Sequence, residues 1–259
     1  MGSRLRVRCV SLLAACGSAP LAPLHRTAEL AKAPSVPRPA PVFQGLQKPQ
    51  EDALVALDAD TRTVVESAAF RAAVEDIDAI DAAANGDPFS GGAVARIYAG
   101  EVARFVRAPI CYGYDADESS SETANTKVKQ QACGVDDAAL LVVHQTVLNR
   151  ANGGIDGRAC AINTLAHEWT HAIYDPHRPM AKDPWMIFVD GDADSAPSAV
   201  VSYTIGAIAQ CVYLRTTYQQ LDLATCIDAV GTRTFRPCTC QKGWAEHLDK
   251  GVDVCAGAR

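Results

Sequence analysis

The sequence predicts a mostly helical α+β domain with a small sheet, stapled by disulfides. Hydrophobic residues make up 48% of the 259 residues, which is enough for a buried core. Several long segments carry apolar residues at three- and four-residue spacing, as helices do, and one short apolar run is typical of a buried strand. Ten cysteines are a high number for a reducing compartment.

The N-terminus has the pattern of an export signal. Three arginines at positions 4 to 8 precede an apolar stretch over 9–15 that is too short to span a bilayer. Residues 13–17, Leu-Ala-Ala-Cys-Gly, are similar to a bacterial lipobox. We therefore expect residues 1–15 to be removed and Cys16 to carry lipid. An ordinary signal peptide, which leads to full secretion, is the alternative.

The number of cysteines agrees with lipidation. If Cys9 is removed and Cys16 is lipidated, an even number remains, which allows four disulfides. The sequence does not indicate which cysteines pair. Cys238 and Cys240 are expected to join two separate disulfides rather than to bind metal. The remaining cysteines are Cys111, Cys133, Cys160, Cys211, Cys226, Cys238, Cys240 and Cys255.

A proline-rich tether is expected over residues 16–50, because seven of the fourteen prolines lie between residues 17 and 50. Such a tether would hold the folded domain, residues 51–259, off a membrane. The N-terminal lipid would then be the only membrane contact, and the protein would reside in the bacterial cell envelope or on its surface.

Two helices and a loop are expected next. From 51 to 84, apolar residues recur at helical spacing until an Asn-Gly-Asp-Pro turn. A second helix is expected over 93–107, before an Ala-Pro pair. The polar residues 112–131 predict an exposed loop between Cys111 and Cys133.

A strand and two further helices are expected in the second half. Residues 139–148 are rich in Leu and Val, which predicts a buried strand containing a core histidine, His144. Helical spacing continues over 159–174. Residues 195–214 carry no charge, but their hydroxyl and amide side chains favour a buried helix over a membrane span. The domain is expected to end in a cysteine-rich tail.

The strongest functional pattern lies in the 159–174 helix. His167 and His171 are four residues apart, so they project from one helical face and can bind one Zn²⁺. Glu168 can take a proton from a water molecule whose pKa zinc lowers towards about 7. The opposite face is apolar, as packing against a core requires.

These residues resemble the zincin metallopeptidases, and the resemblance covers about thirty of the 259 residues. In zincins a His-Glu-x-x-His helix supplies two zinc ligands and the general base. The resemblance implies these roles for His167, His171 and Glu168. It also implies a zincin-like fold, with the 139–148 strand beside the helix and lining the cleft.

The third zinc ligand has two main candidates. Asp190 stands where many members of the gluzincin branch have a Glu, and this branch is favoured; Asp194 could orient a ligand. His177 stands six residues after His171, where the metzincin branch has a third His. Asp183 is a more distant candidate. Three tyrosines that could stabilise an oxyanion are not ranked by the sequence; they are Tyr174, Tyr203 and Tyr213.

The sequence thus predicts an exported zinc metallopeptidase that acts on peptide or protein substrates. One alternative is a catalytically silent zincin-fold lipoprotein that serves as a binding or scaffold module. Another is a zinc amidase acting on cell-wall peptides. The formal net charge of −6 disfavours nucleic acid as a partner.

Overall fold

The computed structural model describes residues 40–74, 110–116, 124–128, 131–136, 139–171, 197–231 and 236–255. The helices are α1 (Lys48–Val65), α4 (Gln145–Ala151), α5 (Gly154–His171), α6 (Pro197–Leu214), α7 (Leu223–Val230) and α8 (Trp244–Asp249), with a short 3-10 helix, η1, at Pro237–Cys240. The strands are β1 (Val42–Gln44), β2 (Ile110–Asp115), β3 (Ala124–Val128), β4 (Gln131–Ala132), β5 (Val135–Asp136) and β6 (Ala139–His144).

The main sheet is small and mixed, with the order β1-β2-β6-β3. β1, β2 and β6 run parallel, and β3 pairs antiparallel with β6 at one edge. β4 and β5 form a separate hairpin. Its turn places Cys133 at φ +52°, and a disulfide from Cys133 to Cys111 ties the hairpin to β2.

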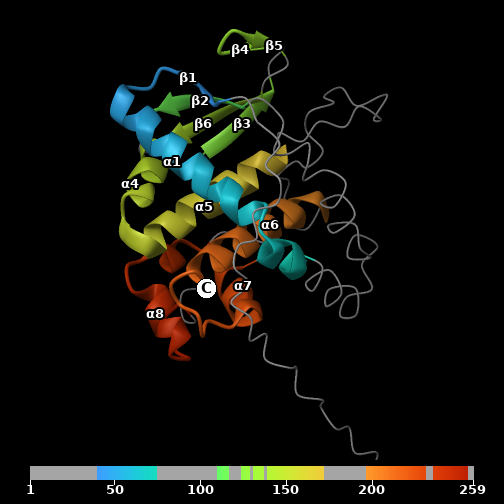
Figure 1. Cartoon of the computed structure of the whole chain (residues 1–259), viewed down its shortest axis with the longest axis vertical. Coiled ribbons are helices and arrows are strands. Elements are labelled where there is room, and N and C mark those ends of the chain that lie inside the picture. The colour runs from blue at the N-terminus through green and yellow to red at the C-terminus, as the bar shows by residue number, and fades with distance from the viewer. Residues whose placement is uncertain are drawn as a thin grey trace, which may run out of the picture.

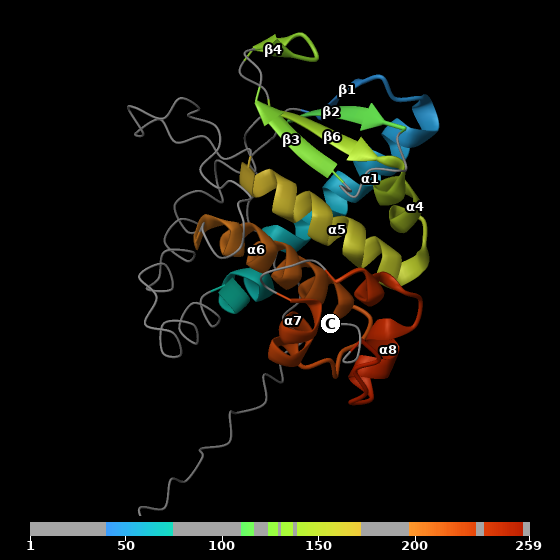
Figure 2. The same cartoon turned by 180° about the vertical axis from the view of Figure 1, so that it is seen from behind.

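α5 is the central helix of the molecule (Figures 1 and 2). It packs against α1, α4 and α6 and contacts the sheet at β3, and α1 also contacts α6. Every side chain from Ala159 to His171 is buried as a result. The coarse fold class is therefore confirmed: the described chain is mostly helical, with a small sheet and disulfide cross-links.

The helix expected over 51–84 starts earlier and is interrupted. α1 begins at Lys48 and ends at Val65. Ser67 then starts a new helical segment over 68–74, because its Oγ accepts a hydrogen bond from the Phe70 N–H at 3.0 Å, as a helix N-cap does. Residues 75–84 and the helix expected over 93–107 lie outside the described residues.

The exposed loop expected over 112–131 is wrong in part, because β2 continues to Asp115 and β3 occupies Ala124–Val128. The Tyr112 side chain is buried in the core rather than solvated. Polar residues can occupy such strands because the ladder satisfies their backbone groups whatever the side chain.

The strand expected over 139–148 ends at His144, and α4 begins at the next residue. Val147, Leu148 and Ala151 are buried at helical spacing. A short apolar run does not by itself distinguish a buried strand from a buried helix. His144 is buried, as expected for a core histidine.

Two later helices were expected. The one over 159–174 is α5, which starts earlier, at Gly154; its expected last residues, 172–174, lie outside the described chain. The buried helix expected over 195–214 is α6 and is confirmed. None of the helices in the described ranges is long and apolar enough to cross a membrane.

Residues 42–50, assigned above to the tether, belong to the folded part, since β1 pairs in parallel with β2 and α1 starts at Lys48. The expected signal peptide, Cys16 and the rest of the tether up to residue 39 fall outside the described residues.

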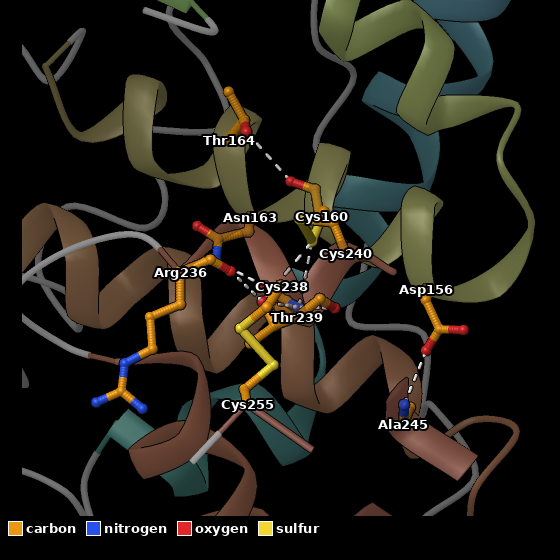
Figure 3. Close-up of a disulfide and its surroundings, with 11 residues drawn as sticks. Asp156, Cys160, Asn163, Thr164, Arg236, Cys238, Thr239, Cys240, Ala245 and Cys255 are labelled. Atoms are coloured by element: carbon orange, nitrogen blue, oxygen red, sulfur yellow. Dashed lines mark hydrogen bonds between the residues drawn. A yellow bond between two sulfur atoms is a disulfide. The ribbon is translucent and has the colours of Figure 1, made fainter. Parts of the chain in front are cut away.

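The eight cysteines of the described chain form four disulfides. Cys238 pairs with Cys255 and Cys240 pairs with Cys160, so the two neighbours join separate bonds, as predicted. Figure 3 shows both bonds beside the start of α5. The other two bonds are Cys111–Cys133 and Cys211–Cys226.

Candidate metal centre

The start of α5 is anchored by the C-terminal part of the chain (Figure 3). The buried Asp156 carboxylate accepts hydrogen bonds from the backbone N–H groups of Gly243 at 2.8 Å and Ala245 at 3.0 Å. One turn later, Cys160 is joined to Cys240. These contacts hold the first turns of α5, and the candidate site lies at its other end.

The three side chains that the sequence predicts to act together lie side by side at the C-terminal end of α5. Nε2 of His167 and Nε2 of His171 are 3.2 Å apart, and the two ring planes are inclined by 78°. One ligand atom from each histidine and one carboxylate oxygen of Glu168 all lie within 4.8 Å of one another. In the part of the chain that the structure describes, this is the one cluster of three His, Cys, Asp or Glu side chains able to hold a metal ion.

The spacing of the two nitrogens fits zinc. Two ligand nitrogens at 2.0–2.1 Å from a tetrahedral Zn²⁺ are separated by about 3.3 Å. The observed separation of 3.2 Å, at which the two rings are in hydrogen-bond contact, is close to this value. Imidazole nitrogen and carboxylate oxygen are also ligands that zinc takes in proteins.

The site is more enclosed than the sequence predicts. An apolar stripe on the opposite face alone would leave these side chains open to water, but His167, Glu168 and His171 are only 8%, 6% and 4% exposed. The packing of α5 against α1, α4, α6 and β3 contributes to this burial. Burying polar groups with so little water is costly unless they are hydrogen-bonded or bind an ion, and electrostatic interactions are stronger there than in water.

α6 borders the site through two consecutive residues. The ring of Tyr203 lies 4.7 Å from the ring of His167, at an interplanar angle of 63°. Thr170 Oγ1 donates to the His167 carbonyl at 2.7 Å and lies 2.6 Å from Ser202 Oγ. Of the three tyrosines that the sequence left unranked, the structure thus brings Tyr203 to the site.

Of the other two tyrosines, the structure describes only Tyr213, which lies away from the site. Tyr213 lies three turns further along α6, where burial and the nearby Asp60 carboxylate raise its pKa while Arg158 lowers it. Tyr174 lies outside the described residues.

A buried polar chain on the other side of α5 was not indicated by the sequence analysis. Trp169 Nε1 donates to the Tyr112 hydroxyl at 3.2 Å, and that hydroxyl donates to Asp58 Oδ1 at 2.7 Å. Arg62 donates to the other Asp58 oxygen at 2.7 Å. The sequence feature that could have indicated this chain is Asp58, a carboxylate on the face of α1 that is buried. A charged group among core residues needs hydrogen-bond or ionic partners.

The candidates for a third ligand are not placed by the structure. Asp190, Asp194, His177 and Asp183 all fall within residues 172–196, which lie outside the described chain. His144 is not a member of the metal-binding cluster.

Comparisons with protein-family models, with curated proteins and with solved structures found no match for this chain.

Proposed function

We propose that this protein is a zinc-dependent peptidase of the zincin type. One observation carries the proposal: two histidine nitrogens face each other at the separation that a shared Zn²⁺ requires, with a carboxylate beside them on the same helix. Helix spacing alone puts the histidines on one face. It does not require their Nε2 atoms to converge.

In this proposal His167 and His171 hold Zn²⁺ through Nε2. Asp190 is the preferred third ligand, with Asp194 orienting a ligand, and His177 is the alternative. Bound zinc would lower the pKa of a water molecule and polarise the substrate carbonyl. Glu168 accepts the proton of the attacking water and delivers it to the leaving amine, which is the role of a general base and then of a general acid.

The proposed location is the outside of a bacterial cell, with a lipid at Cys16 or, alternatively, full secretion. The four disulfides of the described chain support an oxidising compartment, since such bonds are rare in a reducing cytosol. The substrate is then a peptide or protein met in the cell envelope or in the medium.

The first prediction concerns Glu168. In Glu168→Gln the proton acceptor is lost while both histidines remain, so kcat/KM on a peptide substrate should fall by about 10²- to 10⁴-fold, with zinc still bound. Metal analysis and a fluorogenic peptide assay on the same preparations measure both quantities. Glu246→Gln, an exposed glutamate on α8, is the matched control and should retain activity. If Glu168→Gln is as active as the wild type, the assigned mechanism is wrong.

A zinc-binding module without catalysis is the second candidate, and the near-complete burial of the three side chains favours it. Such a protein would bind zinc yet cleave nothing across a broad peptide library. Peptidoglycan fragments belong in the same screen, because cleavage of these alone would indicate a cell-wall amidase.

A further inference from the structure

We infer that Tyr203 on α6 is a positioning residue that holds the His167 imidazole in its metal-binding orientation. The inference rests on the proposed function, since it assigns Tyr203 a role in zinc binding. It goes further by naming a side chain from a second helix on which the site depends.

The first observation is the contact between the two rings. Tyr203 meets His167 at a centroid distance of 4.7 Å and an interplanar angle of 63°, which is the edge-to-face arrangement that aromatic rings prefer. The His171 ring lies 5.0 Å from His167 in a second edge contact. A change in the plane of the His167 ring would disturb both ring contacts and move its Nε2 relative to His171.

The second observation is a hydrogen-bonded connection from α6 to the backbone of His167. The single hydroxyl proton of Thr170 goes to the His167 carbonyl, so in the 2.6 Å contact with Thr170 the donor is Ser202. Both hydroxyls are fully buried. Adjacent residues of α6 therefore contact His167 at its ring and, through Thr170, at its carbonyl.

The third observation explains why α6 does not slide along α5. Ser202, Gly206 and Gln210 are spaced four residues apart, which places them in one row on α6. Gly206 lies against Asn163, and the Asn163 amide donates to Gln210 Oε1 at 2.8 Å. The row fixes the register of the two helices and so the position of Tyr203.

A side chain that is already oriented loses less conformational freedom when it binds an ion. Removal of the Tyr203 ring should therefore weaken zinc binding by about three- to tenfold, the scale of one edge-to-face pair or one ordered side chain. The contact with His167 is between the two rings, so phenylalanine at position 203 should retain this contact.

The test is a competition titration of the full chain with a chromophoric zinc chelator. We expect Tyr203→Leu to bind zinc about three- to tenfold more weakly than the wild type, and Tyr203→Phe to bind it within about twofold of the wild type. Tyr213→Leu removes another half-buried tyrosine from the same helix and should leave zinc affinity unchanged. The visible spectrum of the Co²⁺-loaded protein should change in Tyr203→Leu and remain wild-type in Tyr203→Phe.

The outcomes separate this inference from the proposed function. If Tyr203→Leu binds zinc as tightly as the wild type, or if Tyr213→Leu weakens binding equally, the positioning role is wrong and the zinc site stands. If Tyr203→Phe loses as much zinc affinity as Tyr203→Leu, the aromatic ring of Tyr203 is not the group that positions His167. A wild-type chain that binds no zinc would overturn both the proposed function and the inference.

Discussion

At the scale of single residues, Gly206 shows how closely α5 and α6 approach each other. A Cβ at this position would lie 2.2 Å from Asn163 Oδ1 and 3.0 Å from the Asn163 carbonyl oxygen. Alanine normally stabilises a helix interior relative to glycine by roughly 1 kcal/mol. At position 206 the clash with Asn163 should make alanine destabilising relative to glycine.

We expect Gly206→Ala to lower the free energy of unfolding by about 1–3 kcal/mol, the usual cost of overpacking, as measured by urea unfolding. A double-mutant cycle with Asn163→Ala provides the control. The clash with the side chain disappears in that background, so Gly206→Ala should cost less there. Strictly additive effects would contradict the close approach.

The residue scale also shows what a single sequence can reveal. The position of His167 and His171 on one face of α5 followed from their spacing of four residues, which is local geometry. Tyr203 and Asp58 could not be assigned in the same way, because their partners are brought together only by the packing of α5 against α6 and α1. The predicted roles of Asp190 and His177 remain predictions.

At the scale of elements, the Cys160–Cys240 disulfide joins α5 to η1 across 80 residues of sequence. Buried polar side chains surround this disulfide, among them Asn163 and Thr239, which Figure 3 shows beside the bond. The Gln210 amide donates a hydrogen bond to Thr239 Oγ1 at 3.3 Å, and the Asn163 amide donates one to Gln210. The bond and this network together hold α5, α6 and the C-terminal segment to one another.

Replacing Cys160 and Cys240 together by alanine should therefore lower stability more than replacing Cys111 and Cys133, whose separation is 22 residues. The chain-entropy estimate is about 4.5 kcal/mol for the longer loop and about 3.4 kcal/mol for the shorter one. Guanidinium unfolding of both double variants measures the difference. If both double variants lose the same free energy of unfolding, the Cys160–Cys240 disulfide stabilises the fold no more than the Cys111–Cys133 disulfide does.

The elements also mark where sequence patterns stop being informative. Long stretches with helical spacing gave α5 and α6 with small errors at their ends. The end of β6 at His144 was missed, because Val147 and Leu148 suit a buried strand and a buried helix equally well. β3 was missed because its polar residues carry no apolar signal and are placed by pairing with β6.

At the scale of the whole molecule, the layers explain the site. α5 is surrounded by α1, α4, α6 and the sheet, and two imidazoles and a carboxylate near its C-terminal end are buried (Figures 1 and 2). In such an environment a carboxylate attracts a bound cation more strongly than it would in water. The burial of these side chains could not be predicted from the His-Glu-x-x-His pattern, because it depends on the packing of helices that are distant in sequence, such as α1 and α6.

The most direct test of the account is X-ray absorption at the zinc K-edge of the full chain loaded with one equivalent of Zn²⁺. If His167 and His171 share the ion, the spectrum should show two imidazole nitrogens at about 2.0–2.1 Å, with the remaining ligands light atoms and no sulfur. His171→Ala should reduce the imidazole contribution to one ring or abolish binding. A wild-type spectrum with sulfur ligands, or with no imidazole, would contradict the claim that His167 and His171 share a metal ion.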